Sequence, residues 1–204
     1  MIMHDDEPGS VSAIVLAAGL SCRMQENKLL LPWQTSTVIG WVVTQLVDAG
    51  MTRIVVVTGR DKKIVESLTS FPGVVHVFNE RYADGEMLHS LQVGLKSLPD
   101  DVNAALVVLG DQPQIEIETI LLVTREFEKD HNCKLVLPSR QNRRGHPWIV
   151  ARELWGEIIS LEPPDNLRTF LDLHSGEITY VLVNTNSIFA DIDTPQDYQD
   201  ALKH

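Results

Sequence analysis

The sequence predicts a single-domain α/β protein built around an open, mainly parallel β-sheet. The chain has 204 residues, the length of one ordinary domain, and that length suffices to bury a full core. Continuous β-branched runs such as residues 53–59 are typical of strands that are covered on both faces. These runs alternate with segments whose apolar residues recur at helical spacing, which is the pattern of consecutive βαβ units.

Seven segments are expected to form strands, because each is a short, mostly apolar run bounded by polar or turn residues. In order they are residues 11–19, 53–59, 73–79, 104–114, 134–139, 146–151 and 178–184. The first and the fourth run directly into turns, which begin at Gly19 and Gly110.

Six segments are expected to form helices, because their apolar residues recur three or four positions apart. In order they are residues 36–50, 62–70, 86–98, 117–130, 166–176 and 194–204. The first of them ends at the stop signal Gly50 and the fifth at Gly176, whereas Pro195 lies in the first turn of the last.

Composition excludes several classes of protein. The formal net charge of −11 argues against a nucleic-acid-binding protein, which would show a basic surface. No stretch approaches the ~18 apolar residues of a membrane span, and the acidic first ten residues do not resemble a signal peptide. Two cysteines without a C-x-x-C pair indicate a reducing compartment. We therefore expect a cytoplasmic protein with a disordered arm at residues 1–10 and one domain at residues 11–204.

The segment "LAAGLSCRMQENK", after the first strand, combines small residues with two cations. Ligands of open α/β sheets bind at the carboxyl ends of strands, and consecutive backbone N–H groups in a turn bind anions. Ala17, Ala18 and Gly19 allow close approach to their backbone, whereas Ser21, Arg23 and Lys28 supply a hydroxyl and two charges suited to phosphate. The loop is neither a Walker loop nor a G-x-G-x-x-G loop. The alternative is a tight turn with solvated cations.

Two further segments carry carboxylates. "LGDQP" places Asp111 just after the fourth strand, and "DIDTP" places Asp191 and Asp193 two residues apart. Magnesium prefers few carboxylates together with water and phosphate oxygens, which Asp111 and Asp193 would suit. Alternatively, Asp111 stabilises a turn and Asp193 caps the last helix; for "DIDTP" taken alone, the cap is favoured.

The segment "LAAGLSCRMQENKLLLP" resembles the signature L-A-A-G-x-S-x-R-M-G-x-x-K-x-L-L-P of the nucleotidyltransferases that activate molybdopterin, in particular the molybdenum cofactor cytidylyltransferases. Gln25 departs from it, because the family usually has glycine there. "GDQP" and "DIDTP" are similar to metal-binding segments of such enzymes, and "RRGHPWIV" matches the R-G-H-P segment. "NERYADGEMLHSLQVGL" resembles a further family segment, although Leu88 and His89 stand where small residues are usual.

The resemblance implies a Rossmann-like three-layer α/β/α fold, like that of nucleotide-diphospho-sugar transferases, with some antiparallel strands late in the chain. It implies Arg23, Lys28 and Asp111 as catalytic residues. It implies Mg²⁺ as the cofactor, with Asp111, Asp193 and Asp191 as ligands. Pterin contacts are implied at Gly145, His146 and Pro147. The implied nucleotide-binding residues are Leu16, Ala17, Ala18, Gly19, Ser21, Arg23, Lys28, Asn79, Gly85, Ser90 and Asp111.

The implied reaction is transfer of CMP from CTP to the terminal phosphate of molybdopterin, with release of pyrophosphate. Such a phosphate is largely dianionic at neutral pH and needs no general base. Ala18 marks the choice of cytosine, because guanylyl enzymes usually carry L-A-G-G at this place. The implied partners are CTP, molybdopterin, and a molybdenum hydroxylase apo-enzyme or its insertion chaperone. The alternatives are a GTP-dependent guanylyltransferase, a cytidylyl- or uridylyltransferase acting on a sugar phosphate, and a non-catalytic pterin carrier.

Overall fold

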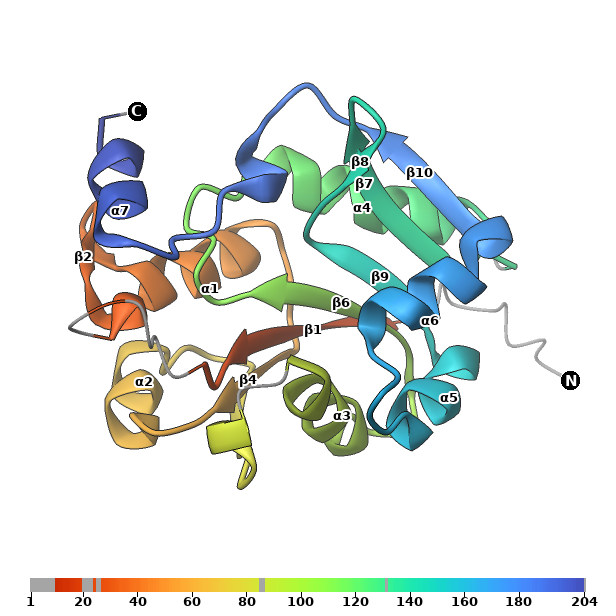
Figure 1. Ribbon diagram of the computed structural model, residues 1–204, viewed down its shortest axis with the longest axis horizontal. Coiled ribbons are helices and arrows are strands. Elements are labelled where there is room, and N and C mark those ends of the chain that lie inside the picture. Colours follow the sequence, from red (N-terminus) through yellow and green to blue (C-terminus); the bar gives the residue numbers. More distant parts are fainter. Residues whose placement is uncertain (1–9, 20–23, 25–26, 85–86, 131, 204) are drawn as a thin grey trace, which may run out of the picture.

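The computed structural model describes residues 10–19, 24, 27–84, 87–130 and 132–203. Its centre is an eight-stranded sheet with the order β10–β7–β9–β6–β1–β4–β5, to which β8 is added beside β7 (Figure 1). The strands are β1 (Ser10–Ala17), β4 (Ile54–Thr58), β5 (Val74–Phe78), β6 (Val102–Leu109), β7 (Leu135–Arg140), β8 (Arg143–Arg144), β9 (Trp148–Ala151) and β10 (Ile178–Leu182). All seven predicted strands are therefore present, and the first begins one residue earlier, at Ser10.

The sheet is mostly parallel. β5, β4, β1 and β6 are parallel neighbours, and β10 is parallel to β7. β9 is antiparallel to both β6 and β7, because it returns through a short connection from β7 and β8. The predicted fold class is confirmed, including the antiparallel strands late in the chain.

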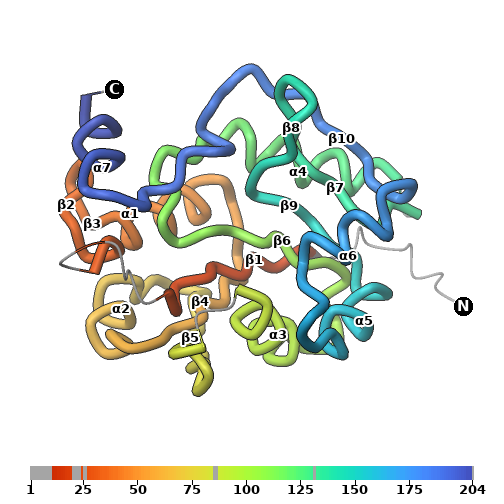
Figure 2. Tube along the Cα trace, viewed as in Figure 1, coloured from red at the N-terminus to blue at the C-terminus, as the bar shows by residue number. Residues whose placement is uncertain are grey.

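Helices cover both faces of this sheet (Figures 1 and 2). Side chains of β1 alternate: Ala13 and Val15 pack with α1 (Val38–Asp48) and α4 (Ile117–Lys129), whereas Ile14 packs with the helices of the other face. Those helices are α3 (Met87–Ser97), α5 (Trp155–Ser160) and α6 (Leu167–Leu173). α2 (Lys62–Leu68) contributes Val65 to the α1 side. Two buried clusters thus sandwich the sheet, as the three-layer expectation requires.

Several elements were not predicted. They are α5, the hairpin of β2 (Pro32–Trp33) and β3 (Ser36–Thr37), the short β8, and the 3-10 turns η1 (Lys28–Leu30), η2 (Tyr82–Asp84), η3 (Arg152–Leu154), η4 (Ser175–Glu177) and η5 (Ser187–Phe189). The last helix, α7 (Pro195–Ala201), lies against the hairpin, where Tyr198 Oη donates to the carbonyl of Pro32 at 2.5 Å. This contact ties the end of the chain to the segment that carries Lys28.

No helix in the described part of the chain is long and apolar enough to cross a membrane.

Candidate active site

The carboxyl ends of β1 and β6 form the base of the candidate site. The two strands pair in parallel, with Leu16 opposite Leu109, so the residues that follow each strand emerge side by side. The amide of Gly110 donates to the carbonyl of Leu16 at 3.0 Å. A Cβ at Gly110 would lie 2.9 Å from that carbonyl oxygen, so a glycine suits this close approach. Asp111 therefore starts beside the loop that begins at Ala18.

Lys28 joins two of the predicted carboxylates. Its Nζ lies 2.6 Å from Oδ2 of Asp111 and 2.9 Å from Oδ1 of Asp193. Burial would lower the pKa of Lys28, but the charges and hydrogen bonds of the two aspartates outweigh it and leave the pKa raised. Lys28 is thus held as a cation by two carboxylates, of which Asp193 lies 165 residues away in the sequence.

The N-cap of α7 is Thr194, not Asp193. Thr194 Oγ1 accepts from the amide of Asp197, and the amide of Thr194 donates to the Asp197 carboxylate, which makes a capping box. The alternative in which Asp193 caps the last helix is therefore wrong. The carboxylate of Asp193 faces Lys28 instead.

Asp191 completes a group of three carboxylates. Its Oδ1 accepts a hydrogen bond from Nε2 of Gln112, a buried side chain next to Asp111. Burial raises the pKa of Asp191, and the charges of Asp111 and Asp193 raise it further, although the hydrogen bond from Gln112 and the charge of Lys28 oppose this. The amide of Ile192 donates to the carbonyl of Asp111 at 3.1 Å and fixes the two segments together.

A pocket of about 460 Å³ opens above these groups. We call it the carboxylate pocket. Besides Asp111, six predicted site residues line it: Leu16, Ala18, Gly19, Ser90, Asp191 and Asp193. The remaining lining residues, which the sequence did not indicate, are Tyr82, Met87 and Leu109. The structure therefore gathers most of the predicted nucleotide and metal residues around one cavity.

Some predicted residues are placed elsewhere. The side chain of Ala17 is buried in the core on the α1 side. Asn79 is buried, donates to Ser90 Oγ at 3.1 Å and accepts from the amide of Arg81 at 2.9 Å, so it positions the pocket wall. The predicted residues Ser21, Arg23 and Gly85, together with Gln25, lie outside the described residues.

The R-G-H-P segment packs tightly against the turn at Ile188. A Cβ at Gly145 would lie 2.5 Å from the carbonyl oxygen of Ile188, and the amide of His146 donates to that oxygen at 3.0 Å. The bond between His146 and Pro147 is cis. Burial lowers the pKa of His146 to about 4, and no described residue forms a hydrogen bond with its buried Nδ1. At neutral pH this imidazole is therefore uncharged.

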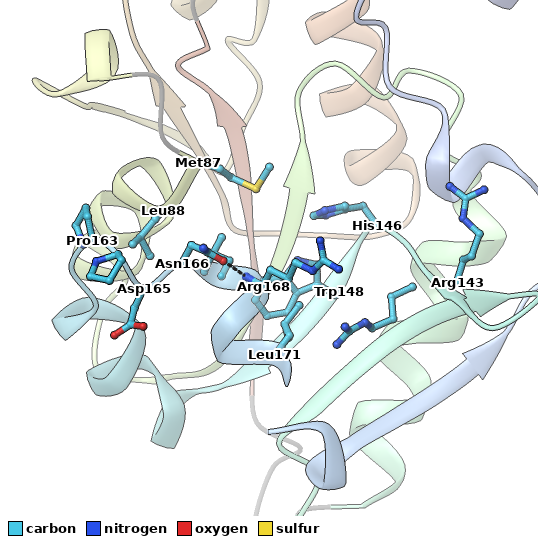
Figure 3. Close-up of a pocket in the computed structure, with 13 residues that line it drawn as sticks. Met87, Leu88, Arg143, His146, Trp148, Pro163, Asp165, Asn166, Arg168 and Leu171 are labelled. Atoms are coloured by element: carbon cyan, nitrogen blue, oxygen red, sulfur yellow. Dashed lines mark hydrogen bonds between the residues drawn. The ribbon is translucent and has the colours of Figure 1, made fainter. Parts of the chain in front are cut away.

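A second pocket, of about 810 Å³, lies beside His146 (Figure 3). We call it the arginine pocket. Its apolar side includes Trp148, Leu88 and Leu171, and its polar residues include Arg143, Arg144, Arg168, Asp165 and Asn166. Met87 belongs to the linings of both pockets. Neither Gly145 nor Pro147 lines the arginine pocket, so these two residues support His146 from behind.

The carboxylates suit a divalent cation, but not as a complete protein cage. Among the described residues, no three His, Cys, Asp or Glu side chains are arranged to hold a metal ion. Asp111 and Asp193 nevertheless direct two carboxylates at one ammonium group, and Asp191 leaves the group with more negative charge than Lys28 balances. A hard cation that takes one or two carboxylates and completes its shell with phosphate and water fits this donor set.

Residues 13–178 match the family described as the MobA-like NTP transferase domain. The chain belongs to this family. It is 27% identical over 190 residues to the molybdenum cofactor cytidylyltransferase of Escherichia coli K12, covering 93% of this chain and 94% of that protein. A nucleotidyl transferase from Methanothermobacter, Mth528, has a TM-score of 0.80 at 24% identity and covers 96% of this chain and 97% of its own. Rv0371c of Mycobacterium tuberculosis H37Rv, solved in complex with manganese, has a TM-score of 0.76 at 25% identity over 95% and 98% of the two chains.

Sequence reasoning missed several residues that form the two pockets. Gln112 could have been found, because an amide directly after Asp111 is placed to hold a neighbouring carboxylate. Arg168 gave no comparable signal, since one arginine in a short helix is usually a solvated surface residue. Tyr82 lies in η2 and Met87 is the first residue of α3, and neither stood out from the ordinary apolar and aromatic positions of the sequence.

Proposed function

We propose that this nucleotidyltransferase transfers CMP from CTP to the terminal phosphate of molybdopterin and releases pyrophosphate. The observation that carries the proposal is the meeting of two unlike pockets at Met87. The carboxylate pocket has the charged groups and the exposed backbone that a metal-bound triphosphate needs. The arginine pocket has both apolar side chains and cations in its lining, which suit an anionic fused-ring acceptor. The name of the Escherichia coli relative supports the same reaction.

In the carboxylate pocket, the chain's own groups position the triphosphate and balance its charge. Lys28 is a cation fixed against Asp111 and Asp193 of the pocket lining, and the backbone at Ala18 and Gly19 is available to a phosphate. A Cβ at Gly19 would meet no atom of the described residues within 4 Å, which leaves room there for a ligand at this backbone. A divalent cation held by Asp111 and Asp193 would neutralise charge on the phosphates during transfer. Arg23 is proposed as a second cation on sequence grounds.

In the arginine pocket, the acceptor is recognised as a ring and as an anion. Met87 and Leu171 offer apolar surface to a fused heterocycle, and Nδ1 of neutral His146 has no described partner. A heterocycle presents N–H groups at its edge, and the unprotonated nitrogen of the imidazole accepts from such a group, because the backbone of Val107 takes the ring's N–H. The terminal phosphate of the bound acceptor then passes Met87 toward the α-phosphate. Because that phosphate is already a dianion, the pocket needs no general base.

Release of pyrophosphate tests the proposal. The purified chain is incubated with Mg²⁺, each of the four nucleoside triphosphates, and either molybdopterin or no acceptor. We expect release that depends on molybdopterin and is at least about tenfold faster with CTP than with GTP, a difference of about 1.4 kcal/mol. Binding of molybdopterin without pyrophosphate release would instead identify a pterin carrier. Activity only with sugar phosphates would identify a sugar nucleotidyltransferase.

GTP is the second candidate substrate, and Ala18 is the observation that weighs against it. Ala18 lines the carboxylate pocket, where a methyl group narrows the space for a base. A methyl clash alone supplies only ~1–3 kcal/mol of discrimination. Equal or faster turnover with GTP would overturn the choice of CTP and leave nucleotidyl transfer intact.

A further inference from the structure

We infer that Arg168 is the residue of the arginine pocket that binds the negative charge of the acceptor. The inference rests on the proposed function and deepens it, because it names an acceptor-binding group that no motif in the sequence indicated. It depends on the charges around the pocket, on the partners of each arginine, and on the place of Arg168 in the fold.

The arginine pocket is cationic in a strongly acidic protein. The whole chain has a formal net charge of −11, yet this one cavity is lined by Arg143, Arg144 and Arg168 against a single carboxylate, Asp165. Three cations around one cavity favour an anionic ligand, and guanidinium groups favour phosphate and carboxylate geometry in particular.

Two of the three arginines already have partners. Arg144 Nη2 donates to Oδ1 of Asp172. The guanidinium of Arg143 lies over the ring of Phe189, 4.4 Å from its centroid. Within the described part of the chain, no ion pair within 4.0 Å joins Arg168 to a carboxylate, although its charge reaches Asp172 and helps to lower the pKa of that carboxyl. Arg143 likewise has no carboxylate partner there, but Figure 3 places it to one side of the pocket, whereas Arg168 lies in the middle. Arg168 is therefore the arginine best placed for a ligand.

The backbone of Arg168 is held in place. Asn166 is the N-cap of α6, and its Oδ1 accepts from the amides of Arg168 at 3.0 Å and Thr169 at 3.1 Å. Figure 3 shows Arg168 in the middle of the pocket, between Asn166 on one side and Trp148 and His146 on the other. A ring bound in the middle of this pocket, beside the exposed Met87, therefore places its charged substituents near this guanidinium.

The test measures acceptor binding and nucleotide use separately. Anaerobic equilibrium dialysis gives the Kd for molybdopterin, and steady-state assays give KM for molybdopterin and for CTP. We expect Arg168→Gln to raise the Kd and the KM for molybdopterin at least about tenfold, as for a lost charge-assisted contact, while the KM for CTP stays unchanged. Arg168→Lys should recover only part of the loss, because an ammonium lacks the planar fork. The matched control is Arg125→Gln on α4, at the opposite face of the sheet, which should behave as the unchanged chain.

Failure of this inference is distinguishable from failure of the proposed function. Unchanged Kd and KM in Arg168→Gln, with normal pyrophosphate release, would overturn the role of Arg168 alone. Absence of pyrophosphate release from the unchanged chain with molybdopterin would overturn the proposed reaction. If another phosphorylated acceptor supports release, the same variants are compared with that acceptor, and an unchanged KM in Arg168→Gln would again reject the inference. Arg168 is exposed, so folding of the variants is expected and is checked by their thermal midpoints.

Discussion

The two pockets differ in how their charges are satisfied. In the carboxylate pocket, Lys28 binds Asp111 and Asp193, and Gln112 binds Asp191, so the protein pairs its own polar groups before any ligand arrives. In the arginine pocket, Nδ1 of His146 has no hydrogen-bond partner among the described residues, and Arg168 forms no ion pair there within 4.0 Å, although its charge reaches Asp172. The polar groups of the first pocket are thus paired within the fold, whereas we propose that a ligand pairs those of the second.

The difference follows from the strands that support each pocket. β1 and β6 are adjacent, parallel and buried. The residues that directly follow them therefore meet at one edge of the sheet, independently of the conformation of the longer loops. The arginine pocket takes its residues from the short β8, the loop before β9 and the short helix α6, which lie in the mixed part of the sheet. In the proposed function, the charges at the strand ends hold the nucleotide, and the charges on the short elements late in the chain select the acceptor.

Asp111→Asn tests the paired arrangement and should have the largest effect. The change removes a charge from the proposed cation site and one of the two carboxylates that hold Lys28. We expect turnover to fall at least about a hundredfold, about 2.7 kcal/mol of transition-state stabilisation, with the fold retained. Pyrophosphate release at saturating Mg²⁺ is the measurement, and Asp48→Asn at the exposed end of α1 is the control. Near-normal turnover of Asp111→Asn would contradict the assignment.

Gly145→Ala tests whether the stability of the mixed part of the sheet depends on close packing next to His146. A Cβ there would lie 2.5 Å from the carbonyl oxygen of Ile188, so the turn must move. We expect a loss of ~1–3 kcal/mol in the free energy of unfolding, as for other overpacked sites, together with a higher KM for the acceptor. Gly156→Ala in α5 is the matched control, because its Cβ would meet no atom within 4 Å, and it should be neutral or stabilising. Equal stabilities in urea unfolding would refute the packing argument.

His174 provides a smaller, pH-dependent test of stability in the same C-terminal part of the fold, just after α6. Its Nε2 lies 2.9 Å from Glu157 Oε1 and its Nδ1 lies 3.2 Å from Glu177 Oε2. Burial alone would lower the pKa of His174, but the bonds and charges of the two glutamates outweigh it and raise the pKa. A raised pKa contributes stability below the unfolded value of about 6.5, and this stability is lost as the pH rises through the folded pKa.

We therefore expect His174→Gln to lower the free energy of unfolding more at pH 6 than at pH 8.5, where the histidine of the unchanged chain is largely neutral. Urea unfolding at both pH values measures the difference. The same loss at both values would show that the ion pairs of His174 contribute nothing measurable, although Lys134 lies close to Glu177 and shares its charge.

The sequence predicted the parallel half of the fold well, because buried β-branched runs such as that of β4 admit few alternatives. It also predicted Asp111 as a site residue, since its motif follows such a strand. It did not predict α5, a six-residue helix with only Trp155 and Ile158 buried, because a single turn and a half shows no measurable periodicity. The hairpin of β2 and β3 was hidden for the same reason, as each strand has two residues.

Site residues were predictable where a sequence motif determines which residues lie next to them. They were not predictable where contacts between distant segments determine this. Lys28 and Asp193 were both expected in a site, but their direct ion pair joins segments 165 residues apart and is visible only in the structure. Asn79 illustrates the opposite case, because its polar side chain is used inside the protein to hold Ser90. Arg168 became a candidate only when its place in the middle of the arginine pocket was known.

Transfer of label from CTP tests the central claim most directly. The chain is incubated with Mg²⁺, molybdopterin and CTP that is radiolabelled at either the α- or the γ-phosphate, and the pterin product is isolated. If the carboxylate pocket holds the triphosphate and the arginine pocket holds the acceptor, label from the α-phosphate appears in the pterin product and label from the γ-phosphate appears only in pyrophosphate. Label from the γ-phosphate in the pterin, or none from the α-phosphate, would contradict the account.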